Sequence, residues 1–380
     1  MLKLPPLSLY IHFPWCVKKC PYCDFNSHHL KGDIPAKAYL YTLLLDLQSH
    51  AHDLQARQFD SIFLGGGTPS LFPSNELSQL FEYLFKHKLI ADHAEITIEA
   101  NPGTIEHGKF SDYKAMGINR VSLGVQSLQN DKLKTLGRIH NAQNVYNAVN
   151  ELTHAGFNNF NIDLMHGLPD QSIDDALFDL REALALKPTH LSWYQLTLEP
   201  NTAFAIKPPK LPDEDLLFTI EQQGKALIQS AGFIQYETSA YCKDTKYQAK
   251  HNLNYWQFGD YIGIGAGAHG KITLPETGII RRHWKRKNPK LYMQELQFPY
   301  GSSDIATDER PYEFMLNALR LQHGFSIKQF EQTSGLSIDA ITPQLNKAIS
   351  RELLTKESEY FIPTELGQRF LNDLLHIFLP

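Results

Sequence analysis

The chain has 380 residues, of which 42% are hydrophobic and 11% aromatic, and its formal net charge is −5 at pH 7. This length allows one large buried core and a second, smaller domain. The negative net charge argues against a protein that gathers nucleic acid or anionic lipid through its overall field. No apolar run is long enough to cross a bilayer, and the first residues lead into a strand pattern without the apolar stretch of a signal peptide. We therefore expect a cytoplasmic protein.

Short β-rich runs alternate with longer helical patterns over residues 1–235. The predicted strands are Leu7–His12, Asp60–Leu64, Glu95–Ala100, Arg120–Val125, Phe160–Leu164 and His190–Leu196. The clearest predicted helices are Ala36–His50, Ser74–Phe85, Ile173–Leu186 and Glu214–Ala231, and each follows a residue suited to a helix start. Such alternation predicts parallel strands with right-handed crossovers. Because about six strands are fewer than a closed barrel needs, we expect an α/β fold built on a partial parallel β/α barrel.

The pattern changes after residue 235. Residues 236–303 are rich in aromatic residues and glycine, and we expect them to form an extension of the barrel that carries a basic stretch at Arg281–Lys290. Residues 304–380 return to helical patterns and predict a small, mainly helical C-terminal domain of winged-helix-like type. Its predicted helices are Pro311–Leu321, Ile327–Gln332, Ile341–Ile349 and Leu366–Phe378, with a short strand at Glu359–Pro363.

Three of the four cysteines form a tight group directly after the first predicted strand. They are Cys16, Cys20 and Cys23. In a large cytosolic chain, such grouping favours a metal or redox site over a disulfide framework. Their spacings let one loop place three thiolates around one face of an iron–sulfur cluster, and a local set of three leaves one iron open to another ligand. In a parallel barrel, a loop that follows a strand lies on the face where ligands bind.

A zinc site is the alternative for these cysteines. His28, His29 or Cys242 would then supply the fourth ligand. Zinc sites usually draw their ligands from two close pairs, and this sequence has no second pair.

The spacing Cys-x3-Cys-x2-Cys resembles the signature of the radical S-adenosylmethionine (SAM) superfamily. In that superfamily the open iron of a [4Fe–4S] cluster binds the amino and carboxylate groups of SAM, and the reduced cluster cleaves SAM to a radical. A second motif agrees, because the strand ending in Gly65, Gly66 and Gly67 is similar to the superfamily's SAM amino-group motif. Glycines at that place allow a ligand to approach the backbone closely. The resemblance implies a [4Fe–4S] cluster on the three cysteines and SAM beside it.

Further strand ends resemble the oxygen-independent coproporphyrinogen oxidase-like branch of the superfamily. They include Ile98–Pro102, Ser122–Ser127 with Arg138 beyond it, and Asn161–Pro169. This resemblance implies that Tyr10, Gly66 and Glu99 contact the SAM bound to the cluster. It also implies that Gly67, Thr68, Gln126, Arg138 and Asp163 line the neighbouring pocket, which holds a second SAM in the oxidase. Taken alone, Glu99 could cap a helix, Arg138 could be a solvated charge, and Asp163 could belong to a buried hydrogen-bond network.

Two departures weaken the reading as an oxidase. The oxidase has a further cysteine two residues after the third one, and this chain has Phe25 there. The oxidase also carries an N-terminal extension, whereas this chain starts six residues before its first predicted strand.

The segment His251-Asn252-Leu253-Asn254-Tyr255-Trp256 is similar to the His-Asn-x-x-Tyr-Trp signature of the heme chaperones within this branch. That resemblance implies a protein that binds heme and passes it to acceptor proteins, including respiratory or membrane-associated ones, without oxidising coproporphyrinogen. It leaves open whether SAM is cleaved. A neutral imidazole is a good heme ligand, so His251 is the candidate axial ligand and His269, in a glycine-rich segment, is a second one. His251 could equally cap a turn while the two aromatic residues fill the core.

The basic stretch contains Arg281, Arg282, Lys285, Arg286, Lys287 and Lys290. It could bind heme propionates, an anionic membrane surface or RNA, or it could be a solvated hairpin. Three functions therefore compete: a heme chaperone, an oxygen-independent coproporphyrinogen dehydrogenase and an RNA-modifying radical SAM enzyme. We favour the heme chaperone, with an electron donor for the cluster and no nucleic-acid partner.

Overall fold

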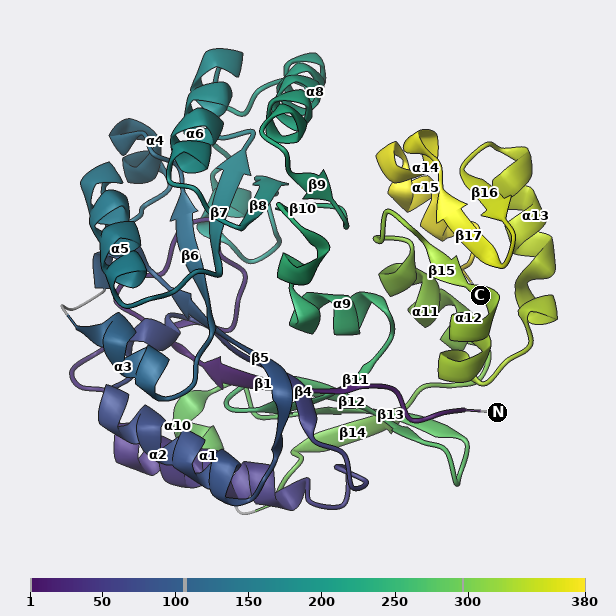
Figure 1. Ribbon diagram of the computed structural model, residues 1–380, viewed down its shortest axis with the longest axis horizontal. Coiled ribbons are helices and arrows are strands. Elements are labelled where there is room, and N and C mark those ends of the chain that lie inside the picture. Colours follow the sequence, from purple (N-terminus) through teal and green to yellow (C-terminus); the bar gives the residue numbers. More distant parts are fainter. Residues whose placement is uncertain (1, 105–107, 296, 380) are drawn as a thin grey trace.

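The computed structural model describes residues 2–104, 108–295 and 297–379. One large sheet organises most of the chain (Figure 1). Its parallel strands are β1 (Leu7–Phe13), β4 (Phe59–Gly66), β5 (Ile90–Ala100), β6 (Arg120–Gln126), β7 (Phe160–His166), β8 (His190–Gln195) and β11 (Asp260–Ile264). Its antiparallel strands are β9 (Ile234–Gln235), β10 (Ala240–Cys242), β12 (His269–Leu274), β13 (Ile279–Trp284) and β14 (Gly301–Asp304). The strand order is β14-β13-β12-β11-β1-β4-β5-β6-β7-β8-β10-β9, so the described strands form an open sheet.

The predicted α/β fold with a parallel sheet is confirmed. Each of the six predicted strands overlaps one of the parallel strands from β1 to β8, and neighbours among them pair in parallel. The seventh parallel strand, β11, comes from the extension and pairs with β1 from Leu7↔Asp260 to Ile11↔Ile264. Because six of the seven residues of β1 are buried, this strand needs neighbours on both edges and cover on both faces.

Helices cover the outer face of the sheet (Figure 1). They are α1 (Ala36–Ser49), α2 (Ser74–Lys86), α3 (Lys109–Ala115), α4 (Asn130–Thr135), α5 (Ala142–His154), α6 (Ile173–Ala185) and α8 (Glu214–Ser230). The four predicted helices are present to within one residue at each end. Ser172 and Asp213 accept hydrogen bonds from backbone N–H groups in the first turns of α6 and α8, which fixes where these helices begin.

Three short helices lie in the remaining connections: α7 (Ala203–Ile206), α9 (Lys250–Trp256) and α10 (Pro289–Tyr292). Helix α9 lies between the sheet and the C-terminal part of the chain (Figure 1). It belongs to the same segment as β11, so the extension both widens the sheet and covers part of its inner side.

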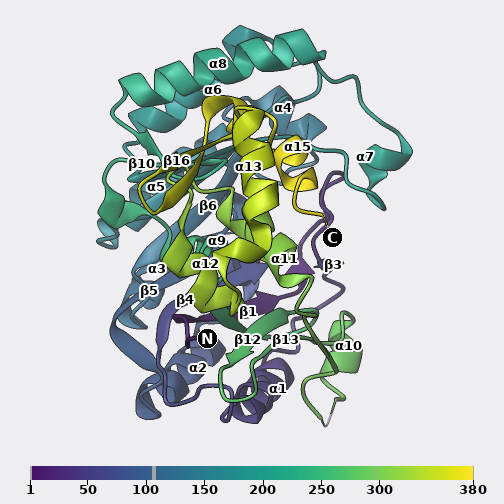
Figure 2. The same ribbon diagram turned by 90° about the vertical axis from the view of Figure 1, so that its right-hand side faces the viewer.

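The C-terminal part of the chain forms a separate cluster in front of α9 in the view of Figure 2. Its elements are α11 (Arg310–Ala318), β15 (Phe325–Ser326), α12 (Ile327–Ser334), α13 (Thr342–Ser350), β16 (Leu354–Glu357), β17 (Tyr360–Pro363), α14 (Glu365–Arg369) and α15 (Leu371–His376). The three strands form an antiparallel sheet in the order β15-β17-β16. The predicted helix Leu366–Phe378 is interrupted, because Phe370 leaves the helical conformation at φ −108° and ψ 46°.

Two hydrophobic cores correspond to this arrangement. The larger one includes residues from Leu7 to Tyr292. The smaller one centres on Phe314, whose ring contacts the rings of Phe325 and Phe330 edge to face. A backbone bridge between Glu237 and Leu321 joins the two parts next to the inner side of the sheet. Within the described residues, every helix is too short or too polar to cross a bilayer.

Candidate functional site

The cysteine loop leaves the sheet at the end of β1 and is closed by a short parallel ladder. In this ladder β2 (Trp15–Cys16) pairs with β3 (His28–His29). The backbone N–H of His28 donates to the carbonyl of Pro14 over 2.7 Å, and that of Leu30 donates to the carbonyl of Cys16 over 2.9 Å. These bonds hold the two ends of the loop together, so the cysteines between them face one region.

Each thiol of the loop has a polar neighbour. Thr68 Oγ1 donates to Cys16 Sγ over 3.5 Å, Arg138 Nη1 donates to Cys20 Sγ over 3.8 Å, and Cys23 Sγ lies 3.8 Å from Ser27 Oγ. All three thiols are partly exposed and free of disulfides. Hydrogen bonds to sulfur stabilise thiolate ligands and tune the clusters that they hold.

The donor set fits a cluster better than a single ion. Among the residues that the structure describes, no group of three or more His, Cys, Asp or Glu side chains is arranged to hold one metal ion. A four-iron cube is larger than an ion, so its ligands surround a space rather than converge on a point. Burial raises the pKa of Cys16 and Cys23, so cluster binding at neutral pH must displace their protons.

The zinc alternative gains no support from the structure. Cys242 is fully buried on β10, beside Tyr236. The imidazole of His28 contacts Asn26 and the carbonyl of Lys287. The three candidates for a fourth zinc ligand, Cys242, His28 and His29, all lie outside the cavity that the three cysteines share.

The end of β4 supplies the glycine-rich wall next to the loop. Gly66 has a φ of +112°, and a Cβ atom there would lie 2.5 Å from the ring of His12. A Cβ atom at Gly67 would lie 2.6 Å from the carbonyl oxygen of Trp15. Only glycine fits these two positions, and both glycines line the cavity next to the cysteine loop.

Glu99, at the end of β5, lies next to this wall. Its carboxylate accepts a hydrogen bond from the N–H of Gly66 over 3.2 Å. Burial, followed by the nearby charge of Asp163, raises the pKa of Glu99 to about 8. A cationic group bound beside Glu99 would favour its ionised form, which is the requirement for holding an ammonium group.

The next strand ends bring Gln126, Arg138 and Asp163 to the same region. Gln126 has a φ of +73° at an irregularity of β6, and its side-chain oxygen accepts a hydrogen bond from Tyr194. Arg138 Nη2 donates to the carbonyl of Gly124 over 2.5 Å. Asp163 accepts hydrogen bonds from Ser122 and Asn161, and burial raises its pKa. The positive φ of Gln126 is a left-handed conformation, which is costly for a residue other than glycine and is often found at binding sites.

One cavity of about 410 Å³ joins these strand ends to the cysteine loop. Of the residues that the sequence predicts, the cavity is lined by Cys16, Cys20, Cys23, Gly66, Gly67, Thr68, Glu99, Gln126, Arg138 and Asp163. Tyr10 is the predicted SAM contact that lies outside this set. It lines a neighbouring cavity together with Gly66 and Glu99.

No sequence pattern places Glu237 and Arg320 on the far wall of the cavity. There Asn252 and Trp256 of α9 face Glu237 and Arg320, and the Arg320 guanidinium lies 4.8 Å from the centre of the Trp256 ring. Arg320 follows α11, about 300 residues after the cysteine loop, and no spacing or motif connects the two. The backbone bridge at Glu237 and Leu321 explains how this arginine reaches the cavity.

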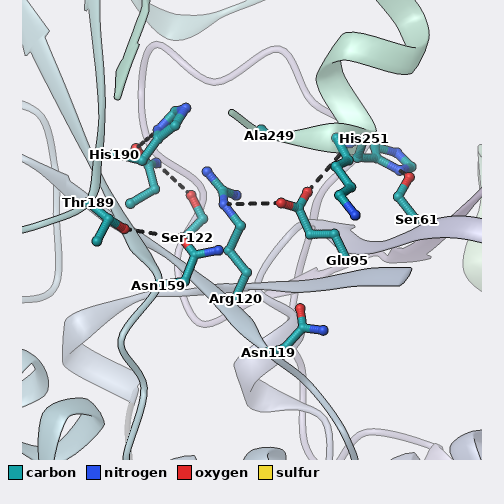
Figure 3. Close-up of polar contacts among 12 residues, drawn as sticks. Ser61, Glu95, Asn119, Arg120, Ser122, Asn159, Thr189, His190, Ala249 and His251 are labelled. Carbon is teal, nitrogen blue, oxygen red and sulfur yellow. Dashed lines mark hydrogen bonds and ion pairs between the residues drawn. The ribbon is translucent and has the colours of Figure 1, made fainter. Parts of the chain in front are cut away.

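His251 does not lie on the cavity wall. It is 2% exposed, its Nδ1 is 3.0 Å from Ser61 Oγ, and its Nε2 is 3.0 Å from the hydroxyl of Tyr255. Its ring also stacks on Phe63 with centroids 5.1 Å apart. Burial lowers its pKa to about 3, so the imidazole is neutral at pH 7. Figure 3 shows His251 next to Ser61 and Glu95 at the base of α9.

A buried ion pair supports this end of α9. Arg120 Nε lies 3.9 Å from a carboxylate oxygen of Glu95, and both side chains are buried (Figure 3). The other oxygen of Glu95 accepts a hydrogen bond from the backbone N–H of His251 over 3.5 Å. Burial raises the pKa of Glu95, and the positive charge of Arg120 opposes that rise. This pair connects the start of β6 to the first turn of α9.

The basic stretch is mostly neutralised by acidic partners. Its ion pairs are Arg281–Asp304, Arg282–Glu313, Lys285–Asp46 and Arg286–Glu295. Lys285 is fully buried in its pair. Lys287 and Lys290 have no ion-pair partner among the described residues, so the stretch does not present six free charges to a polyanion.

Comparison with known proteins matches two parts of the chain to family models. Residues 10–180 match the radical SAM superfamily, and residues 305–370 match the HemN C-terminal domain. In overall fold the chain resembles a solved structure described as coproporphyrinogen III oxidase (HemN) from Escherichia coli, a radical SAM enzyme. The TM-score is 0.82 and the identity 23%, over 99% of this chain and 90% of that one. The fold and the cysteine-lined cavity therefore define a radical SAM protein of the HemN-like branch.

Similarity to curated proteins extends over the whole chain. The heme chaperone HemW of Haemophilus influenzae is 51% identical, over 100% of this chain and 99% of its own length. The heme chaperone HemW of Escherichia coli is also 51% identical, over 100% of both chains, and that of Bacillus subtilis is 32% identical, over 98% and 99%. The chain belongs to the HemW family.

Proposed function

We propose that this protein is a heme chaperone, which holds a [4Fe–4S] cluster and SAM, binds heme and transfers it to acceptor proteins. One observation carries the proposal: a single cavity joins three free thiols to the glycine-rich end of β4 and to the carboxyl group of Glu99. The full-length similarity to proteins named heme chaperones supports the part of the proposal that concerns heme.

In this proposal, Cys16, Cys20 and Cys23 bind three irons of the cluster. When bound, the cluster supplies an electron that can cleave SAM. Tyr10, Gly66 and Glu99 contact the SAM on the open iron, and the hydrogen bond between Gly66 and Glu99 orients that carboxylate. The neighbouring residues Gly67, Thr68, Gln126, Arg138 and Asp163 line the space for a second ligand. Arg138 would also place a positive charge next to Cys20.

The sequence predicts His251 as the axial heme ligand, and this assignment stays a prediction. In its present position both ring nitrogens are engaged, by Ser61 and by Tyr255. Ligation would require the imidazole to give up one of these hydrogen bonds and to reach a cavity that Asn252 and Trp256 already line. The neutral state of the imidazole favours ligation, whereas its burial opposes it.

A second candidate is the oxidative decarboxylation of coproporphyrinogen, and the overall fold favours it. Phe25 argues against it, because a phenylalanine stands where the oxidase has a further cysteine. Its side chain is 60% exposed and lines the cavity beside Cys23. We therefore propose that the chain uses this position for aromatic contact rather than for thiol chemistry.

We infer that the chain is organised as a partial barrel over residues 1–235, an extension over residues 236–303 and a C-terminal domain over residues 304–380. The separate core around Phe314 supports the last boundary. The element order α11-β15-α12-α13-β16-β17 supports a winged-helix-like C-terminal domain. The boundary at residue 235 does not separate two sheets, because β11 of the extension pairs with β1 and continues the sheet of the barrel.

The proposed partners are heme, an electron donor for the cluster and acceptor proteins, including respiratory or membrane-associated ones. We propose a cytoplasmic location with peripheral membrane contact, since reduced thiols persist in that compartment. RNA modification, the third candidate, would have to use Lys287 and Lys290, because acidic partners neutralise the other cations of the basic stretch.

The test is an anaerobic reconstitution followed by two measurements on the same sample. Hemin titration should give saturable binding, and heme should move to an apo-hemoprotein acceptor that is added later. The same sample should not decarboxylate coproporphyrinogen in the presence of SAM and a reductant. Turnover of coproporphyrinogen without hemin binding would establish the second candidate instead.

A further inference from the structure

A second cavity of about 340 Å³ lies next to the cluster cavity, and the two share Phe25, Gly66 and Glu99. Three tyrosines line it: Tyr10 on β1, Tyr255 on α9 and Tyr261 on β11. The connection between β11 and β12 forms the remaining wall and ends in His269. The cavity is therefore largely aromatic, and it opens beside the exposed ring of Phe25.

His269 differs from the other histidines of this region. The ring nitrogens of His251 are engaged by Ser61 and Tyr255, and those of His12 by Tyr10 and the carbonyl of Asn26. The imidazole of His269 is exposed at the cavity and has no hydrogen-bond or ion-pair partner anywhere in residues 2–104, 108–295 and 297–379. It can accept a new ligand without breaking an existing contact.

The chemistry of the other side chains leaves this imidazole as the available iron ligand. Burial raises the pKa of Tyr10, Tyr255 and Tyr261, so their phenols are neutral at pH 7 and are weak ligands for iron. Partial burial, together with the charges of Lys287 and Arg282, lowers the pKa of His269. A neutral imidazole is the form that binds iron.

A free cation lies next to the same wall. The backbone N–H of Gly267 donates to the carbonyl of Arg286 over 2.8 Å, and Asn26 Nδ2 donates to the carbonyl of Lys287 over 2.9 Å. These bonds fix the chain at Lys287 beside the cavity. Its side chain is exposed and forms no ion pair with any residue in the described part of the chain.

We propose that this second cavity is the heme dock: His269 binds the iron, Tyr255 and Tyr261 contact the macrocycle, and Lys287 pairs with a propionate. A planar aromatic ligand with one iron centre and anionic edges matches an aromatic cavity that carries one free imidazole and one free cation. The inference rests on the proposed heme-chaperone function and assigns its heme to a site different from the one that His251 would make. It also places the heme next to SAM, because Gly66 and Glu99 lie between the two cavities.

The test is anaerobic hemin titration of the reconstituted full chain and of three variants, followed by the Soret band and by electron paramagnetic resonance of the ferric heme. His269→Ala should weaken hemin binding by at least about tenfold and change both spectra, as expected when a metal ligand is lost. Free imidazole added to His269→Ala should restore the spectrum of the original protein. Lys287→Ala should weaken binding by about two- to fivefold without a spectral change, because an exposed ion pair contributes little.

The matched control is His52→Ala, since this histidine is also exposed but lies outside both cavities. It should bind hemin as the original protein does. Cluster iron and sulfide are measured in every variant, so that a misfolded sample is recognised. If the original protein binds hemin and His269→Ala shows the same affinity and spectra, the inference is wrong while the proposed function stands. If the original protein itself binds no hemin, the proposed function fails as well.

Discussion

The cysteine loop and helix α9 both carry a motif with ligand-type residues, but the structure places them differently. The loop turns all three thiols toward the cavity and leaves them partly exposed. Helix α9 turns His251 toward β4, where it contacts Ser61 and Phe63, and the hydroxyl of Tyr255 lies 3.0 Å from the other ring nitrogen of His251. The residues of α9 that line the cavity with the three cysteines are Asn252 and Trp256.

The difference follows from backbone geometry. In a helix, residues four positions apart share a face, so His251 pairs with Tyr255 and Asn252 pairs with Trp256. A loop closed at both ends has no such periodicity and can turn several side chains the same way. Spacing alone is therefore a reliable guide to ligands in the loop and a poor one in the helix.

Replacing Cys16, Cys20 and Cys23 together with serine should have the largest effect. Because the cluster has no other thiolates within this cavity, the variant should retain neither cluster iron nor inorganic sulfide. The measurement is iron and sulfide analysis together with the visible absorbance after anaerobic reconstitution. The matched control is Cys242→Ser, since this thiol lies in the core of β10 and should leave the cluster content unchanged.

Replacing His251 with alanine should destabilise the fold without removing the cluster. The change deletes a stacked, buried ring and removes the hydrogen-bond partner of the Tyr255 hydroxyl, whereas Ser61 keeps its hydrogen bond to Ser8. We expect the free energy of unfolding to fall by about 2–4 kcal/mol, measured by urea denaturation. A stable variant with a changed Soret band would contradict the structural role and support His251 as the heme ligand.

Replacing Gly66 with alanine tests whether the wall next to the cysteine loop requires glycine. The new Cβ atom would meet the ring of His12, and alanine disfavours the positive φ, so we expect a loss of about 1–3 kcal/mol and weaker SAM binding. Equilibrium dialysis of SAM and urea denaturation measure the two effects. Gly232→Ala is the control, because Gly232 has a φ of +82° and open space around it. Equal loss of SAM binding in both variants would show that the clash at Gly66 is irrelevant.

A smaller effect on stability is expected from replacing His140, which lies close to Arg138 and has its Nδ1 3.2 Å from Asn101 Oδ1. Burial, followed by the charge of Arg138, lowers the pKa of His140 to about 3. Its neutral form therefore stabilises the fold above pH 6.5, and this contribution is lost progressively as the pH falls from 6.5 toward 3. His140→Gln should flatten the pH dependence of the unfolding free energy in that window by up to about 1.4 kcal/mol per pH unit. An unchanged slope would mean that His140 is not protonated on unfolding.

The sequence predicted six of the twelve described strands of the large sheet and the near wall of the cavity. Period and capping signals locate four of the long helices and the strands β1, β4, β5, β6, β7 and β8, because these elements bury continuous apolar faces. The strand-end residues Gly66, Glu99 and Gln126 could be predicted to lie together, since the ends of parallel strands meet at one edge.

The rest depends on contacts between segments far apart in the chain. Arg320 reaches the cavity through a backbone bridge that has no sequence signal. The orientation of His251 depends on its fit against Phe63 and Ser61, and the pairing of β11 with β1 depends on a shared core. Such features are fixed by tertiary packing, which local patterns do not encode.

The central claim is that three thiols of one loop hold a four-iron cluster with one iron open to SAM. Mössbauer spectroscopy of the anaerobically reconstituted protein, recorded with and without SAM, tests it most directly. The account predicts a [4Fe–4S] spectrum in which the signal of one iron site changes when SAM is added. A protein that contains zinc, lacks sulfide, or gives the same spectrum with and without SAM would contradict it.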